Sequence, residues 1–374
     1  MNIIGIDLGK TVFHLIGMRP DGSVTAKKRL SRPQLIAFMR NTPPSVVAME
    51  ASCGAHYLGR LFVSQGHEAK LIPAQFVRPF VKSQKNDYDY VDAEAIAEAA
   101  QRPTMRFVPI KTEDQLDLQA IHRVRERLVE RRTALINQFR AFLLERGIIV
   151  RTGRQCLLRR MPEVLATAEE QLAPRMFHLL TSVVAEWRAI EAEIAEMDRE
   201  IGMIAATDEA CIRLQTVPGI GPLIATAVVA AVGNGAAFSR GREFAAWLGL
   251  VPRQASTGGK TKLLGISKHG NTYLRWLFVH GGRSVQHRVS REPHAFGRWL
   301  TELESRTHSN VAGVAMANKL ARIAWVVLNR QEPYRRMDQP SSGGGFGLST
   351  LTTPVSDAAQ GSSMNSLRSA LTNA

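Results

Sequence analysis

The chain has 374 residues, of which 45% are hydrophobic, and carries a formal net charge of +15 at pH 7. This length is sufficient for two or three domains, whereas no apolar run reaches the roughly 18 residues of a membrane span. The N-terminus shows no signal-peptide pattern, and the three cysteines, Cys53, Cys156 and Cys211, form no CxxC pair. We therefore expect a cytoplasmic protein with neither a zinc site nor a disulfide framework.

The positive charge is concentrated in two segments. Residues 122–160 contain eleven arginines and three acidic residues, and residues 253–336 contain fifteen lysines and arginines and four acidic residues. This local excess predicts surfaces that bind nucleic acid, although a generally basic, solvated surface is the alternative. In the first segment, Arg131 and Arg132 are the predicted contacts to an RNA or DNA backbone.

Residues 1–110 are predicted to be α/β. Three apolar stretches separated by short turns predict an antiparallel meander, whose first strand ends at Asp7. Further along the chain, helices are predicted at Arg32–Arg40 and 56–67, and strands at 45–50 and 68–73. This alternation of strands and helices predicts a partly parallel sheet with both faces covered.

Residues 111–206 are predicted to form long helices. Apolar residues recur at steps of three and four over 116–147 and 177–204. Such helices in mid-chain favour an antiparallel pair or a coiled coil, often a dimer interface, with simple intramolecular packing as the alternative. Residues 207–336 are predicted to form a second helical domain, and the low-complexity residues 337–374 a disordered tail.

Four acidic residues are candidates for a metal site. Asp7 and Glu50 end two predicted strands. Asp89 and Asp92 are three residues apart at the start of a predicted helix, which places them on one helical face. Each aspartate alone has a common alternative role as a helix N-cap. Four converging carboxylates would hold two hard cations, which can stabilise both oxygens of a phosphodiester displacement.

Two glycine-containing motifs lie in residues 207–336. The stretch VPGIG predicts a helix-hairpin-helix turn whose Gly219 and Gly221 let backbone N–H groups approach a phosphate. A plain tight turn is the alternative. Residues 249–281 combine hydroxyls, paired glycines and spaced cations, which predicts a phosphate-binding loop with a candidate nucleophile. The cations of this loop are Arg253, Lys260, Lys262, Lys268 and Arg275.

Several motifs together resemble those of a known family. They are GIDLGK, AMEAS, RPFVKSQKND followed by VDAEAIAEA, VPGIGPLIA, FAAWLGLVPRQASTGGK and LLGISKHGNTYLRWLFVHGGR. With these motifs, about residues 1–335 resemble the DEDD transposases of insertion-sequence family 110, in the 1111 subgroup, which are RNA-guided bridge- or seeker-RNA recombinases. The resemblance implies a RuvC-like (RNase H-fold) nuclease domain over 1–110, a helical coiled-coil linker over 111–206, and a C-terminal transposase domain with a serine loop over 207–336.

The resemblance also implies a mechanism and partners. It matches Asp7, Glu50, Asp89 and Asp92 to four acids that hold Mg²⁺, expected as two ions with Mn²⁺ as a substitute. It matches Ser256 to a serine that becomes covalently attached to DNA. The implied partners are a guide RNA and the donor and target DNA. The implied assembly is a homodimer that forms a tetramer with a composite active site between subunits, without a membrane, at the bacterial nucleoid.

Two assignments stay open within this resemblance. The family usually reads K-N-D-x-x-D-A-E-A, whereas a repeated DY gives KNDYDYVDAEA here. Asp87 keeps the spacing to Lys85, and Asp89 keeps the spacing to Asp92. We favour Asp89, because the three-residue step directs two carboxylates to one helical face. Thr257 is the alternative to Ser256, which we favour because a serine hydroxyl is less hindered.

Other functions fit parts of this sequence. A metal-dependent RuvC-like junction nuclease or resolvase that acts by water hydrolysis accounts for the four acids but leaves the serine loop without a role. A sugar-kinase-like ATPase is disfavoured, because no second glycine-rich phosphate loop follows GIDLG. A non-catalytic DNA-binding protein would need only the VPGIG turn. We therefore predict an RNA-guided DNA transposase.

Overall fold

The structure is a computed structural model that describes residues 3–81, 88–151, 153–289 and 296–335. The described residues up to Tyr334 belong to one compact unit, and a second unit begins at Arg335. The predicted disordered tail, residues 337–374, and one candidate metal ligand, Asp87, lie outside the described residues.

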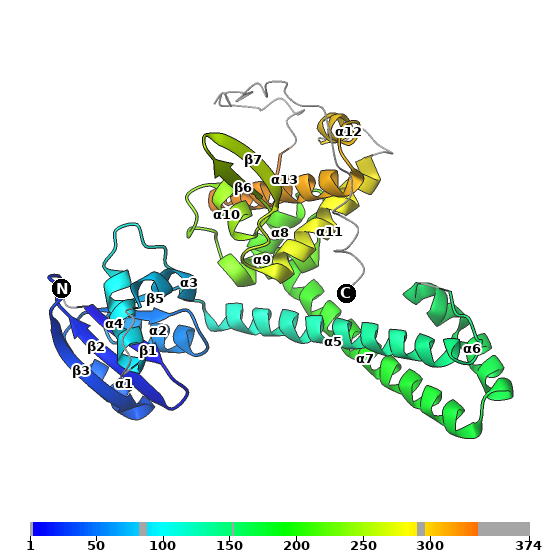
Figure 1. The fold of residues 1–374 in the computed structure, drawn as a ribbon, viewed down its shortest axis with the longest axis horizontal. Helices are drawn as coiled ribbons and strands as arrows, with labels where there is room; N and C mark the ends of the chain where they lie inside the picture. The colour runs from blue at the N-terminus through cyan, green and yellow to red at the C-terminus, as the bar shows by residue number, and fades with distance from the viewer. Residues whose placement is uncertain (1–2, 82–87, 152, 290–295, 336–374) are drawn as a thin grey trace. The chain divides into compact units, whose positions relative to one another are not determined.

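The N-terminal part is built on a five-stranded mixed sheet in the order β3-β2-β1-β4-β5 (Figure 1). The first three strands are antiparallel neighbours, whereas β1, β4 and β5 are parallel. The strands are β1 (Ile3–Leu8), β2 (Val12–Met18), β3 (Val24–Ser31), β4 (Val46–Glu50) and β5 (Glu68–Ile72). The predicted meander and partly parallel sheet are confirmed, in a mixed α/β arrangement consistent with a RuvC-like transposase domain.

Helices cover both faces of this sheet. The helices are α1 (Arg32–Arg40), α2 (Ala55–Ser64), α3 (Ala74–Val77), the 3-10 turn η1 (Arg78–Phe80) and α4 (Tyr88–Ala100). One face buries Ile6 of β1 with Leu35 of α1 and Phe62 of α2. On the other face, Ala97 of α4 packs against Ile16 of β2. Since successive side chains on a strand point to opposite faces, residues in phase with Gly5 on β1 face α4.

Three long helices follow the sheet, of which the apolar spacing predicts the first and the third but not the second. They are α5 (Glu113–Leu144), α6 (Arg154–Gln171) and α7 (Pro174–Thr207). Thr112 caps α5 by accepting a hydrogen bond from the backbone N–H of Gln115. Arg125 of α5 pairs with Asp198 of α7, and Arg131, further along α5, pairs with Glu186, which comes earlier in α7. The two helices are therefore antiparallel. Their shared core includes the buried Phe139 and Trp187.

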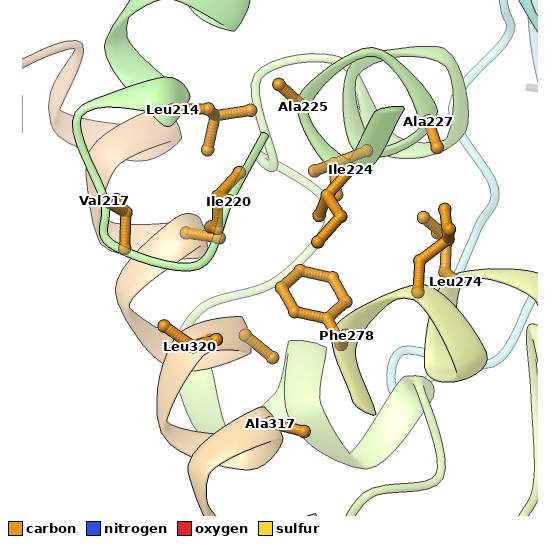
Figure 2. Packing of buried hydrophobic residues seen from close by; sticks show 14 of the residues in the cluster. Leu214, Val217, Ile220, Ile224, Ala225, Ala227, Leu274, Phe278, Ala317 and Leu320 are labelled. Carbon is orange, nitrogen blue, oxygen red and sulfur yellow. The ribbon is translucent and has the colours of Figure 1, made fainter. Parts of the chain in front are cut away.

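The C-terminal part is mostly helical and has its own core. Its helices are α8 (Glu209–Gln215), α9 (Pro222–Val232), α10 (Gly241–Trp247), α11 (Thr272–Val289), α12 (Gly297–Glu304) and α13 (Ser309–Arg330). Figure 2 shows Phe278 of α11 facing Ile224 of α9 and the α13 side chains around Leu320. The buried His122 of α5 joins this core, because its ring nitrogens lie 3.0 Å from the hydroxyls of Tyr273 and Thr226. Burial, with Arg125 nearby, lowers the pKa of His122 to about 4.

One element departs from the helical domain predicted for residues 207–336. A hairpin of β6 (Pro252–Thr257) and β7 (Lys260–Ile266) separates α10 from α11 (Figure 1). Its two-residue turn is formed by Gly258 and Gly259, both at positive φ, which is the backbone that hairpin turns favour. Nearly all of its residues are exposed. Without a buried face the strands lack apolar alternation, and the sequence pattern therefore gave no strand signal.

Helix α13 is the one helix in the described part of the chain that is long and apolar enough to cross a membrane. Half of its most apolar window is buried inside the protein. Met316, Leu320 and Ala324 belong to the same core as Phe278. Core helices of this kind commonly meet length and hydropathy criteria for a membrane span.

Candidate active site

Asp7 and Glu50 lie side by side at one end of the sheet. Strands β1 and β4 are parallel, with Ile6 opposite Met49, so the next residues of the two strands are Asp7 and Glu50. Asp7 is in phase with Gly5, and Glu50 is in phase with the α4-facing Ala48. Both carboxylates therefore lie on the face that α4 covers.

Helix α4 approaches this face very closely at Gly5. A Cβ atom on Gly5 would lie 2.2 Å from the carbonyl oxygen of Ala93 and 2.7 Å from the backbone nitrogen of Ala97. The close approach depends on the missing side chain and on the small alanines of α4. It brings Asp92, which directly precedes Ala93, to the two strand-end carboxylates. Asp89 belongs to the first turn of α4, but its side chain lies outside what the structure describes.

The electrostatics of Glu50 show that these acids interact. Its pKa is raised from 4.5, first by burial and then by the negative charges of Asp7 and Asp92. Half-buried carboxylates that disfavour one another's ionisation are suited to a hard divalent cation, which offsets the repulsion. Across the described residues, no three His, Cys, Asp or Glu side chains gather closely enough to form a metal site by themselves. Asp7, Glu50 and Asp92 are nevertheless oxygen donors that interact at one end of the sheet, and this is the type of ligand that a hard divalent cation prefers.

His14 and Tyr90 lie beside the acids and were not predicted as site residues from the sequence. His14 of β2 is opposite Asp7 in the strand register and is buried. Its ring centroid lies 4.8 Å from that of Tyr90 on α4, and the ammonium of Lys27 lies 4.2 Å from the centre of the Tyr90 ring. These contacts connect the meander to the first turn of α4. Alternation along VFHLIGM could have placed His14 on the α4 face, in phase with Ile16.

Ser256 is exposed on β6, two residues before the hairpin turn. It is opposite Thr261 of β7, and its Oγ accepts a hydrogen bond from Nε2 of Gln254 at 2.8 Å. Thr257, one residue further on, points to the other face, opposite Lys260. Lys262 shares that second face. The lysines of β7 are therefore aligned with Thr257 rather than with Ser256.

Arg275 fixes the base of the hairpin. Its Nη1 donates hydrogen bonds to the carbonyl oxygens of Leu248 at 3.1 Å and His269 at 3.0 Å, on both sides of the hairpin. A Cβ atom on Gly270 would lie 1.8 Å from the carbonyl oxygen of Trp247, so the two chain segments almost touch. Burial lowers the pKa of Arg275. This residue was expected among the phosphate contacts, but its guanidinium is engaged within the protein.

The remaining predicted cations are exposed. Arg253, Lys260 and Lys262 are on the hairpin, and Lys268 follows it with a positive φ of 56°. They are available to a phosphate backbone, as the sequence predicts. Strand alternation places Lys260 and Lys262 on the hairpin face opposite to that of Ser256.

The two glycines of the VPGIG turn have different surroundings. A Cβ atom on Gly219 would lie 2.5 Å from Cγ2 of Val285 and 2.9 Å from the carbonyl oxygen of Gly281, so packing against α11 requires this glycine. Gly221 is exposed at the N-terminus of α9, with open space around its Cα. Only Gly221 therefore leaves room for a phosphate.

Arg131 and Arg132 have acidic partners on α7. Arg131 lies 2.5 Å from Glu186 and remains 60% exposed, whereas Arg132 lies 3.5 Å from Glu191 and is 18% exposed. Glu191 also pairs with Arg154. The two arginines thus connect α5 with α7, a role that their position in a basic segment did not reveal.

Comparison with known proteins finds transposases along most of the chain. The model of the DEDD transposases of IS110, described as "Transposase", matches residues 4–147, and that of the "Transposase IS116/IS110/IS902 family" matches residues 211–298. A probable family 20 transposase of Pseudomonas aeruginosa is 46% identical and covers 89% of this chain and 98% of its own. The transposase for IS1328 of Yersinia enterocolitica is 45% identical (87% and 96%), and that for IS1111A of Coxiella burnetii is 42% identical (90% and 92%).

The sheet, its strand-end acids and these matches define a DNA transposase of the DEDD class, a class that depends on divalent metal. The chain belongs to the IS116/IS110/IS902 transposase family and is similar to the transposases of the IS1111 type. The family resemblance of the sequence motifs is thereby confirmed, and DNA is the substrate.

Proposed function

We propose that this transposase is an RNA-guided recombinase that cuts and rejoins donor and target DNA through a serine nucleophile. Two features of the chain support the proposal. Asp7, Glu50 and Asp92 interact at one end of a sheet, and Ser256 is exposed on a hairpin that Arg275 anchors at its base. The acids suit metal-assisted phosphoryl chemistry, and the exposed hydroxyl suits attack on a DNA backbone.

In the proposed step, Oγ of Ser256 loses its proton and forms a bond to a DNA phosphorus. The bond from that phosphorus to the leaving deoxyribose oxygen breaks, and this oxygen takes up a proton. Attack by the hydroxyl of another DNA strand then releases the serine and rejoins the backbone. The Gln254 amide, which donates to Ser256 Oγ, orients the hydroxyl. Two Mg²⁺ ions, or Mn²⁺ in their place, would supply positive charge at the phosphate oxygens.

The proposed metal ligands are Asp7, Glu50, Asp89 and Asp92. The helical pair α5–α7 is proposed to act as a coiled coil that joins two copies, and two such dimers to form a tetramer. In this assembly the acids of one copy act with Ser256 of another. Asp89 is preferred over Asp87 because it shares a face of α4 with Asp92.

Sequence specificity is proposed to come from a guide RNA that pairs with donor and target DNA, while the protein contacts backbones. The candidate contacts are Arg253, Lys260, Lys262 and Lys268 around the hairpin and Arg131 on α5. The open N-terminus of α9 at Gly221 is proposed to bind a phosphate as part of a helix-hairpin-helix.

Thr257 is the alternative nucleophile, and one observation favours it: Thr257 shares its hairpin face with Lys260 and Lys262. Those ammonium groups could stabilise a developing phosphorane charge. The proposal keeps Ser256, because metal ions supply such charge and because the Gln254 amide is directed at Ser256.

The test compares Ser256→Ala with Thr257→Ala in a strand-exchange assay on donor and target DNA. Removal of a catalytic nucleophile commonly costs about 10⁴-fold or more, so Ser256→Ala should abolish both strand exchange and the covalent adduct while DNA binding persists. Thr257→Ala should retain both. Loss confined to Thr257→Ala would transfer the role to Thr257. Cleavage without any adduct would instead favour a nuclease that uses water.

A further inference from the structure

Helix α11 has an exposed side that the proposed chemistry does not use. Its buried side carries Leu274, Leu277 and Phe278, which belong to the C-terminal core. Its exposed side carries Trp276 and His280, one turn apart, and Arg283 nearly one turn further. A helical step of three or four residues places these side chains along one line.

Trp276 is 50% exposed, which is unusual for the largest apolar side chain. Its ring centroid lies 4.2 Å from that of His280. Burial, and then the charge of Arg283, lower the pKa of His280, which favours the neutral imidazole. A neutral ring can pack beside the indole and hold its orientation while leaving half of its surface to solvent.

The stretch of chain that contains Trp276 is basic, although one acid reaches α11 from α12: Glu304 accepts a hydrogen bond from Gln286. No aspartate or glutamate occurs in the sequence between Glu243 and Glu292, a stretch that contains the whole hairpin and α11. The exposed residue one turn before Trp276 on α11 is Thr272, which is polar rather than apolar. A protein partner would match an apolar surround to the indole, whereas a nucleic acid requires one flat ring within a positive field.

We propose that Trp276 and His280 form a stacking platform for an unpaired base of the DNA substrate, with Arg283 beside it at the phosphate backbone. A transposase must expose single-stranded DNA when strands are exchanged. An indole can hold any base by its flat face, so the platform needs no sequence preference. The platform uses none of the proposed metal ligands and no residue of the hairpin, and it does not depend on which hydroxyl is the nucleophile.

The experiment uses the full chain and a single-stranded DNA oligonucleotide containing 2-aminopurine, whose fluorescence is quenched by stacking. Wild type should quench the probe, and Trp276→Ala should bind it about 10-fold more weakly without quenching. Trp276→Phe, which keeps a flat ring, should recover part of both signals. Val311→Ala is the matched control, because Val311 is 54% exposed on another helix and should leave binding unchanged.

Duplex DNA of equal length provides the second comparison, and Trp276→Ala should change its binding little. If Trp276→Ala lost affinity equally for duplex and single-stranded DNA, the proposal would be overturned. Unchanged binding of single-stranded DNA by this variant would overturn it as well. A loss confined to single-stranded RNA would assign the platform to RNA and contradict the DNA proposal. A changed oligomeric state in light scattering, with unchanged DNA binding, would identify a protein interface instead.

Discussion

At the scale of single residues, Glu50 shows how the site is prepared for a cation. Burial and two neighbouring carboxylates raise its pKa above 4.5. The folded protein therefore binds this proton more tightly than the unfolded chain. As pH rises through the interval above 4.5, ionisation of Glu50 in the folded state removes stability, and bound metal would restore it.

Glu50→Gln should therefore remove a pH dependence of stability. In metal-free buffer, the free energy of unfolding of wild type should decline relative to that of the variant as the pH rises above 4.5. Added Mg²⁺ should raise the Tm of wild type at pH 7 and have little effect on the variant. Calorimetry measures both quantities. Parallel pH profiles for the two proteins would contradict this account of Glu50.

The residue-level predictions succeeded where a simple period decides the geometry. The apolar runs predicted the end of β4 at Glu50 correctly and that of β1 one residue early, since β1 continues from Asp7 to Leu8. The packing of His14 against Tyr90 was not, because it joins a strand and a helix far apart in sequence. The acceptors of Arg275 were equally hidden, since they are backbone carbonyls that only the folded turn brings together.

At the scale of elements, the position of α4 depends on Gly5. An alanine there would place its Cβ against the backbone of α4, 2.2 Å from the carbonyl oxygen of Ala93. Backbone cannot yield as a flexible side chain does, so α4 would have to move. Because α4 carries Asp89 and Asp92, two of the proposed metal ligands would move with it.

Gly5→Ala should lower the free energy of unfolding by about 1–3 kcal/mol and weaken Mg²⁺ binding. Gly202→Ala is the control, because a Cβ on Gly202 meets nothing within 4 Å inside α7. It should stabilise the protein by about 0.5–1 kcal/mol. Denaturant titration and metal calorimetry provide the measurements. A Gly5→Ala variant as stable as wild type would refute the close approach of α4.

The hairpin offers a second prediction at this scale. Arg275→Lys should leave most DNA binding intact but slow adduct formation, because a single ammonium cannot reproduce the planar guanidinium that bonds the Leu248 and His269 carbonyls. Hydrogen exchange of β6 and β7 should accelerate. If exchange is unchanged and DNA binding collapses, Arg275 contacts DNA and does not fix the hairpin.

At the scale of the whole molecule, the positive charge is concentrated in particular segments of the chain. Some of these basic side chains pair with acids of the protein and are therefore less available to nucleic acid. The sequence predicted the basic segment 122–160 but could not show that α7 supplies acids to it. The mostly helical character of the chain after the sheet was predictable from spacing, whereas the exposed hairpin was not. Its strands have no buried face from which a period could arise.

The neighbouring residues Arg131 and Arg132 are therefore expected to have different roles. Arg131→Gln should reduce the salt dependence of RNA or DNA binding by about one unit of slope with little loss of stability, since an exposed ion pair contributes about 1 kcal/mol or less. Arg132→Gln, at a largely covered site, should lower stability and leave the slope unchanged. Binding titrations over a range of salt concentrations, with matched thermal melts, distinguish the two effects.

The proposed mechanism passes through a covalent serine–DNA intermediate, which peptide mapping detects directly. Wild-type protein is incubated with Mg²⁺, guide RNA and DNA, the adduct is trapped in denaturant, and the DNA-linked peptide is sequenced by mass spectrometry. The account predicts a single modified residue, Ser256. A nucleotide on Thr257 or on any other residue, or cleaved DNA with no attached peptide, would contradict it.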